Sequence, residues 1–233
     1  MLYRQMLELF DMLDRPQACG EEVKKLMLER GADEVTVHTV EGTDDNGKKG
    51  TTDCICILVK GKNGKSSGGT APTMGIIGRL GGLGARPEMI GFVSDGDGAL
   101  AALTAGLKVA EMKKNGDVLE GDTIICTHIC PHAPTAPHDP VPFMGSPIDM
   151  EAMNKYEVDP RMDAILTIDT TKGNKIINVN GFAISPTVKD GCILAVSDDL
   201  VETMIRVTGK MPAVFALAQQ DITPYGNGLH HLN

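Results

Sequence analysis

The sequence contains no tryptophan, and aromatic residues make up only 3% of its 233 residues. Acidic residues outnumber basic ones, 31 against 22, which gives a formal net charge of −9 at pH 7. A nucleic-acid-binding protein needs a basic surface, and many such proteins also use aromatic side chains on which bases stack. The sequence lacks both features, so we expect no nucleic-acid partner.

Long apolar runs are also missing, since no stretch approaches the roughly 18 residues that a membrane-spanning helix requires. The opening segment, MLYRQMLELFDMLDR, is amphipathic and contains acids, and it has no small-residue cleavage site of the kind that a signal peptide carries. The six cysteines include no C-x-x-C pair. We therefore expect reduced thiols in a cytoplasmic protein that has no membrane partner.

What is present is an ordinary globular composition, with 42% hydrophobic and 23% charged residues. A chain of this length can bury a substantial core, and we expect one α/β domain over residues 1–233. The proline-rich segment 133–147 (APTAPHDPVPFMGSP) is predicted to be a loop beside the functional site. The 13 methionines and the amphipathic opening segment favour a homo-oligomer.

The stretch from Gly91 to His132 organises the rest of the chain. Leu100, Leu103 and Leu107 recur at helical spacing, and the charge-free segment 123–127 (TIICT) is typical of a strand buried on both faces. A short apolar strand at 91–93 precedes this helix. The pattern predicts a strand–helix–strand unit whose strands lie at the middle of a mainly parallel sheet.

Potential metal ligands gather at the expected carboxyl ends of the strands. Asp95 follows the first strand, Asp169 ends another strand, predicted to be buried, at 163–169, and a His/Cys tract ends the strand at 123–127. Parallel strands align their carboxyl ends at one edge, where open α/β sheets bind ligands. Carboxylates and imidazoles are good zinc ligands. The alternative is that Asp95 and Asp97 only cap the helix. The candidate zinc ligands are Asp95, Asp169, His128, His132 and His231.

The glycine-rich run 78–87 (GRLGGLGARP) carries two arginines, Arg79 and Arg86. It lacks the residue order of a phosphate-binding P-loop. One interpretation is a tight turn with both arginines facing solvent. The other is that Arg79 or Arg86 binds substrate, or neutralises Asp95 in a protein that has lost its metal.

The whole chain resembles the family called domain of unknown function 1177. On shorter motifs it is also similar to the co-catalytic zinc aminopeptidases and deacylases. This similarity implies a three-layer α/β/α fold around a mixed, mainly parallel sheet, with Asp95 in the place of a metal-bridging aspartate. The segments that carry it are Ala18–Val23, Ser94–Gly98, Ala164–Asp169 and the pair His230-His231.

Two departures from the zinc-enzyme pattern shape the functional hypotheses. Those enzymes carry a His-x-Asp pair where this chain has Gly78-Arg79-Leu80, and a Glu-Glu pair where it has 127–132 (THICPH). The first glutamate of that pair is their general base, so a hydrolase built on this chain needs a histidine such as His132 as its base.

Three functions remain open. The first is a zinc-dependent hydrolase that acts on an amide or peptide bond of a small-molecule or peptide substrate. The second is a non-catalytic relative that binds an amino-acid-like ligand or a protein partner. The third is a thiol enzyme in which Cys130 is the nucleophile and His128 or His132 activates it.

Overall fold

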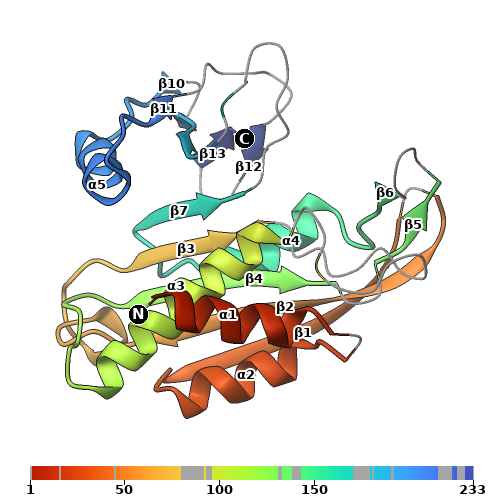
Figure 1. Cartoon of the computed structure of the whole chain (residues 1–233), viewed down its shortest axis with the longest axis horizontal. Helices are drawn as coiled ribbons and strands as arrows, with labels where there is room; N and C mark the ends of the chain where they lie inside the picture. Colours follow the sequence, from red (N-terminus) through yellow and green to blue (C-terminus); the bar gives the residue numbers. More distant parts are fainter. Residues whose placement is uncertain are drawn as a thin grey trace. The chain divides into compact units, whose positions relative to one another are not determined.

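The structure is a computed structural model, and it describes residues 2–15, 17–44, 46–79, 92, 96–130, 133–137, 143–169, 179, 181–189, 192–214, 222–224 and 229–232. The chain forms two compact units, Met1–Thr170 and Thr171–Asn233 (Figure 1). Each unit is described by itself below. The expectation of one α/β domain over residues 1–233 stays a prediction.

The first unit is built on a five-stranded mixed sheet. Its strands are β1 (Glu34–Thr43), β2 (Lys49–Val59), β3 (Met74–Gly78), β4 (Thr123–Ile129) and β7 (Ala164–Ile168), and they lie in the order β1-β2-β4-β3-β7. The pairings β1–β2 and β2–β4 are antiparallel, whereas β3–β4 and β3–β7 are parallel. The predicted mixed sheet is confirmed, and β4 lies at its centre, as the charge-free segment 123–127 indicated.

Two strands differ from the sequence prediction. The parallel partner of β4 is β3, so the strand–helix–strand unit begins at Met74. Gly91 and Val93 of the strand predicted at 91–93 lie outside the described residues. β7 was expected to be buried, but its residues are exposed or half-buried, and Leu166 is 41% exposed. Among the described strands β7 pairs only with β3, and this edge position explains its exposure.

Helices cover both faces of this sheet, which confirms the three-layer arrangement (Figure 1). One face packs against α1 (Leu2–Leu13), α2 (Gly20–Glu29) and α3 (Asp97–Lys114). The other face packs against α4 (Met150–Glu157), where Met153 joins Cys54 and Ile148. The core of the first face includes Leu9, Val23, Met27, Ile55, Ile57, Leu103, Leu107 and Ile125.

The start of α3 is held very close to the ends of β3 and β7. A Cβ atom on Gly98 would lie 2.1 Å from the carbonyl oxygen of Arg79, and one on Gly78 would lie 2.3 Å from that of Gly98. Only glycine permits such an approach of two backbones. The residue before the helix is Gly96, which has no side chain that could cap it. Asp97 is the first helical residue and therefore does not occupy the capping position.

The second unit contains short strands and one helix. The strands β10 (Cys192–Ile193), β9 (Thr187–Lys189), β13 (Leu229–Leu232) and β12 (Ile222–Pro224) form a sheet in that order, and β11 (Ala213–Val214) pairs in parallel with β8 (Ala183–Ile184). Helix α5 (Asp198–Thr208) ends at Gly209, whose φ of 71° is the left-handed conformation typical of a C-terminal cap. None of the described helices is long and apolar enough to cross a membrane.

The proline-rich segment 133–147 and a short 3-10 turn also belong to the first unit. Residues Thr135–Ala136 (β5) and Phe143–Met144 (β6) pair as two short antiparallel strands inside the predicted loop. A single 3-10 turn, η1 (Lys65–Ser67), lies between β2 and β3.

The cysteines correct one sequence expectation. Cys56 and Cys126 form a disulfide, although reduced thiols were predicted. They are 70 residues apart in sequence, but the antiparallel register of β2 and β4 places them directly opposite each other, with Cα atoms 4.3 Å apart. Sequence spacing could not show this pairing, because it arises from strand register. Cys19, Cys54 and Cys192 are free cysteines.

Candidate functional site

Three polar side chains form a buried network at the carboxyl ends of β3 and β4. Arg79 directly follows β3, His128 belongs to β4, and Glu157 is the last residue of α4; they are 3%, 3% and 0% exposed. Nε of Arg79 lies 3.0 Å from Oε2 of Glu157, and Nδ1 of His128 is hydrogen-bonded to Oε1. One carboxylate therefore joins a permanent cation to an imidazole.

Helix α4 positions the carboxylate and also holds the arginine. The helix begins at a capping residue, Asp149, whose side chain accepts a hydrogen bond of 2.8 Å from the backbone N–H of Ala152. One face of the helix then presents Met150, Asn154 and Glu157, because residues three and four apart lie on the same side. The guanidinium of Arg79 contacts the sulfur of Met150 and the amide oxygen of Asn154 as well as the carboxylate.

The network fixes which nitrogen of His128 carries the proton. An ionised carboxylate only accepts hydrogen bonds, and Glu157 is held in an ion pair with Arg79. Nδ1 of His128 must therefore donate to Glu157. The neutral imidazole then presents Nε2 as its acceptor, and such a nitrogen can take a proton or bind a metal.

The same charge acts on a neighbouring thiol. Cys54 lies opposite His128 in the pairing of β2 and β4. Burial and then the negative charge of Glu157 raise the pKa of the Cys54 thiol from 9.0 to about 12. This thiol is protonated at neutral pH and is a poor nucleophile.

Arg79 corrects one of the two interpretations of the glycine-rich run. The turn interpretation placed both arginines at the surface, but the side chain of Arg79 is almost fully buried and pairs with Glu157. The sequence could not reveal this, because its partner lies 78 residues further along the chain, in a helix with no recognised motif. Arg86 and Asp95, the carboxylate that Arg79 was expected to neutralise, lie outside the described residues.

Of the predicted zinc ligands, the structure describes the side chains of His128 and Asp169 alone. His128 lies in the network, and Asp169 is half-buried directly after β7. Asp95 and His132 lie outside the described residues, and for His231 the structure describes only the backbone, within β13 of the second unit. The convergence of these side chains in one cleft therefore stays a prediction.

The described residues do not by themselves fit a zinc site. No group of three or more His, Cys, Asp or Glu side chains among them is placed to hold a metal ion. Directly after β3 the chain places the guanidinium of Arg79, a cation that repels a metal ion. The carboxylate nearest to it, Glu157, already compensates that cation.

The catalytic candidate Cys130 is buried, with 5% exposure. Its thiol donates a hydrogen bond of 3.2 Å to the carbonyl oxygen of Thr51 on β2. This hydrogen bond directs the sulfur of Cys130 toward the backbone of β2. Activation by a histidine at this cysteine stays a prediction, since His132 lies outside the described residues.

Glu157 is the site residue that the sequence analysis missed. It ends the segment MEAMNKYE, in which Met150, Met153 and Glu157 recur at helical spacing. Met153, which is buried, lies four residues before Glu157 on the same helix face, and a buried acid requires a partner. This helical spacing could have indicated that Glu157 is buried, but it does not identify the residues that its carboxylate contacts.

The sequence profile of the family described as "Protein of unknown function (DUF1177)" matches residues 43–233. The chain belongs to this DUF1177 family. The match includes all three residues of the buried network. No curated protein sequence matches the chain.

Solved structures with similarity to this DUF1177 chain include enzymes of related architecture. A Zn-dependent exopeptidase from Parabacteroides distasonis is 14% identical, with 94% of this chain and 76% of that chain covered and a TM-score of 0.44. A leucine aminopeptidase precursor from Bacteroides thetaiotaomicron is 15% identical, with 71% and 60% covered and a TM-score of 0.40. A glutaminyl cyclase from the same organism, bound to N-acetylhistamine, is 16% identical, with 71% and 60% covered and a TM-score of 0.39. At these identities and TM-scores no activity is transferred from them.

Proposed function

We propose that this chain is a hydrolase that cleaves an amide-type bond of a small substrate, with His128 as its general base. The observation that supports this is the buried carboxylate of Glu157, which holds Nδ1 of His128 and leaves Nε2 to accept a proton. The network also lies at the carboxyl ends of two parallel strands, β3 and β4, where α/β folds bind their ligands.

In the proposed reaction, Nε2 of His128 takes a proton from a water molecule whose oxygen attacks the carbonyl carbon. The C–N bond then breaks, and the departing nitrogen receives the proton back from the imidazolium. Glu157 stabilises the imidazolium, as the acidic member of a catalytic triad does. The guanidinium of Arg79, which is permanently charged and 3.0 Å away, holds this carboxylate beside the imidazole.

The proposal can be tested with the purified chain and a defined set of substrates. Dipeptides, N-acetyl amino acids and amino-acid amides are incubated with the protein, and released primary amine is measured. A general base contributes about 10²- to 10⁴-fold, so His128→Gln should lower kcat by at least about 100-fold. Glu21→Gln changes an exposed acid on α2 and serves as the control that keeps activity.

Two results would contradict the hydrolase proposal. One is the same rate of cleavage by the wild-type chain and His128→Gln. The other is no cleavage of any substrate in the set by wild-type protein whose folding has been checked by circular dichroism.

Zinc binding stays a prediction, and the proposed reaction at His128 does not depend on a metal. Elemental analysis of protein purified without chelator or affinity tag measures it directly. If zinc is found at one or more equivalents, Asp95→Asn should lower the zinc content, because Asp95 is the carboxylate that the resemblance places between the metal ions. Unchanged zinc in that variant would contradict this ligand set.

A second candidate function is ligand binding without catalysis. Arg79 favours it, since a buried cation stands where the zinc enzymes have a metal ligand. Binding of an intact substrate analogue with no turnover would support this candidate. The thiol-enzyme alternative makes a different prediction, since alkylation of Cys130 by iodoacetamide would then abolish activity.

A further inference from the structure

A cavity of about 270 Å³ lies in the first unit, and His128 is not among the residues that line it. Thr36 of β1, Cys56 of β2 and Ile124 of β4 form its base, and Tyr156 of α4 covers it. These strand residues alternate with those that pack under α1, α2 and α3, so the cavity lies on the opposite face of the sheet.

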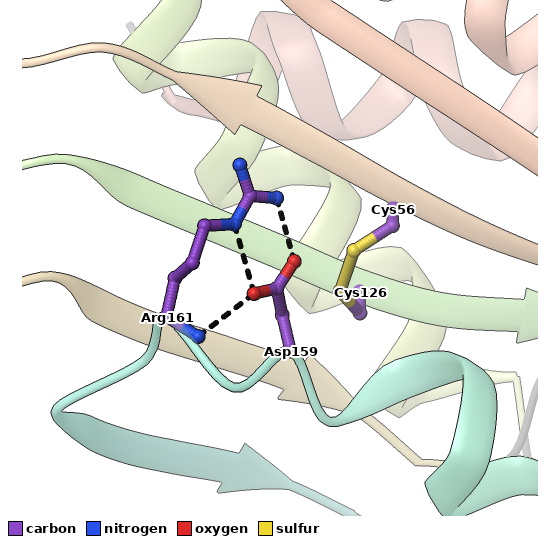
Figure 2. Close-up of a disulfide and its surroundings, with 4 residues drawn as sticks. All are labelled: Cys56, Cys126, Asp159 and Arg161. Carbon is purple, nitrogen blue, oxygen red and sulfur yellow. Dashed lines mark hydrogen bonds and ion pairs between the residues drawn. A yellow bond between two sulfur atoms is a disulfide. The ribbon is translucent and has the colours of Figure 1, made fainter. Parts of the chain in front are cut away.

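Charges of both signs surround this cavity. Glu34 of β1 and Asp159 of the segment after α4 supply carboxylates, and Lys155 and Arg161 supply cations. Arg161 donates from Nε and Nη2 to the two carboxylate oxygens of Asp159, at 2.9 and 2.6 Å (Figure 2). These two contacts use two of the five N–H donors of a guanidinium, and the Arg161 side chain is still 44% exposed. The four formal charges cancel.

The remaining lining is mostly apolar or aromatic, with Thr36 as a polar member. Leu58 and Ile124 belong to a small buried cluster on this face of the sheet. The rings of His38 and Tyr156 have centroids 5.4 Å apart and are tilted by 37°, and Nζ of Lys155 lies 5.5 Å from the Tyr156 ring centroid. A ligand here meets an apolar base and aromatic edges as well as charge.

We propose that this cavity binds a small zwitterion, of the size of a free amino acid or a dipeptide. The carboxylate of the ligand faces Arg161 and Lys155, its ammonium group faces Glu34, and its carbon skeleton lies against the apolar base. Asp159 is already paired with Arg161, which leaves Glu34 and Lys155 as one charge of each sign for a ligand, and a zwitterion can match both whereas an ion of a single sign, such as a phosphate, cannot. The volume lies near the lower end of the roughly 300–1,000 Å³ of ligand pockets, which selects a small molecule.

This site differs from the proposed hydrolase site. The last turn of α4 contributes to both, since Tyr156 lines the cavity and Glu157 contacts His128. The zwitterion site does not depend on hydrolysis at His128. It also combines Glu34, Thr36 and His38, which precede the segment matched by the family profile, with residues inside that segment.

Ligand binding is measured first with the wild-type chain. Binding of each of the twenty L-amino acids and of glycyl dipeptides is measured by saturation-transfer NMR and calorimetry. For each compound that binds, the N-acetylated form removes the ammonium group and the amide form removes the carboxylate. We expect at least one zwitterion to bind with a millimolar or lower Kd, and both blocked forms to bind about tenfold more weakly or not at all.

Two variants that each remove one charge test whether the ligand binds in the cavity. Glu34→Gln and Lys155→Met change exposed side chains, and each should weaken binding about tenfold. Glu21→Gln and Lys24→Met remove an exposed acid and base from α2, outside the cavity, and should leave Kd unchanged. His128→Gln should also leave Kd unchanged while it abolishes hydrolysis.

Four outcomes would overturn the zwitterion site. They are no binding by any compound at 10 mM, equal binding of the blocked forms, unchanged Kd in both cavity variants, and loss of binding in His128→Gln. The last result would place the ligand at the hydrolase site. A chain that binds the zwitterion in this way but cleaves no amide would keep this inference and remove the proposed hydrolysis.

Discussion

The two faces of the sheet in the first unit are built from the same strands but differ in chemistry. The face under α1, α2 and α3 is one continuous apolar cluster. The face under α4 has two small apolar clusters, a buried ion pair and the cavity. Along β4, Ile125 and Ile129 belong to the first face, whereas Cys126 and His128 belong to the second. The difference shows that alternation within one strand can separate an apolar packing face from a face that carries polar groups.

The largest effect is expected from breaking the ion pair on the α4 face. Glu157→Gln leaves the guanidinium of Arg79 buried without a charge to compensate it, and this should lower the free energy of unfolding by about 4 kcal/mol. Urea unfolding followed by circular dichroism measures the change.

The double variant Arg79→Met/Glu157→Met separates charge from packing. It removes both charges together, so it should be much more stable than the single variant Glu157→Gln. Equal loss in the single and the double variant would show that packing, not charge, is what matters on this face.

The apolar face should respond through packing instead. Leu103 of α3 is fully buried, and Leu103→Ala should lower the free energy of unfolding by about 3 kcal/mol, through lost burial and the space that remains. In protein that stays folded, the Kd of a zwitterion and any hydrolytic kcat should be unchanged. A change in either of them would mean that the two faces are coupled.

The sequence was sufficient for the centre of the fold and insufficient for its contacts. The charge-free segment 123–127 and the leucines of α3 correctly predicted a central strand and its helix, because burial on all sides leaves a strong apolar pattern. β7 was misjudged, since an edge strand and a central strand can have the same apolar composition.

Local sequence patterns could not predict contacts between residues that are far apart in the chain. Arg79 was a candidate residue, but the sequence did not indicate its pairing with Glu157, nor the pairing of Cys56 with Cys126. Each pair is fixed by strand register or helix placement, which local sequence does not encode. The proposed zwitterion cavity was not expected at all, because its lining comes from four separate segments of the chain.

A buried carboxylate held mainly by hydrogen bonds gives a smaller expected effect and a pH signature. Asp122 precedes β4 and is 1% exposed; its oxygens accept hydrogen bonds from the backbone N–H groups of Gly61 and Ser66, at 2.9 and 2.7 Å. Burial alone would raise the pKa of Asp122, but these hydrogen bonds outweigh it and lower the pKa below its usual value. Asp122→Asn should lower the free energy of unfolding by about 2 kcal/mol at pH 7.

The lowered pKa sets the pH range of this contribution. The stabilisation is complete above the unfolded pKa, about 3.9 for an aspartate, and is lost as pH falls through the lower folded value. The difference between the wild-type chain and Asp122→Asn should therefore be constant from pH 5 to 7 and shrink below about pH 4. Urea unfolding at several pH values measures it, and a difference that grows on acidification would contradict this account.

The smallest effect is expected from a polar contact on the apolar face. The residue before α2, Cys19, makes no side-chain capping bond, and Asp53 of β2 takes over that role by accepting a hydrogen bond of 2.7 Å from the N–H of Gly20. Because this cap lies near solvent and touches no buried charge, Asp53→Ala should lower the free energy of unfolding by only about 1 kcal/mol. Asp53→Asn keeps an acceptor oxygen and should retain most of the stability. Hydrogen exchange at the first turn of α2 should speed up in Asp53→Ala alone. If Asp53→Ala instead costs as much as Glu157→Gln, polar contacts matter equally on both faces, and the contrast between them fails.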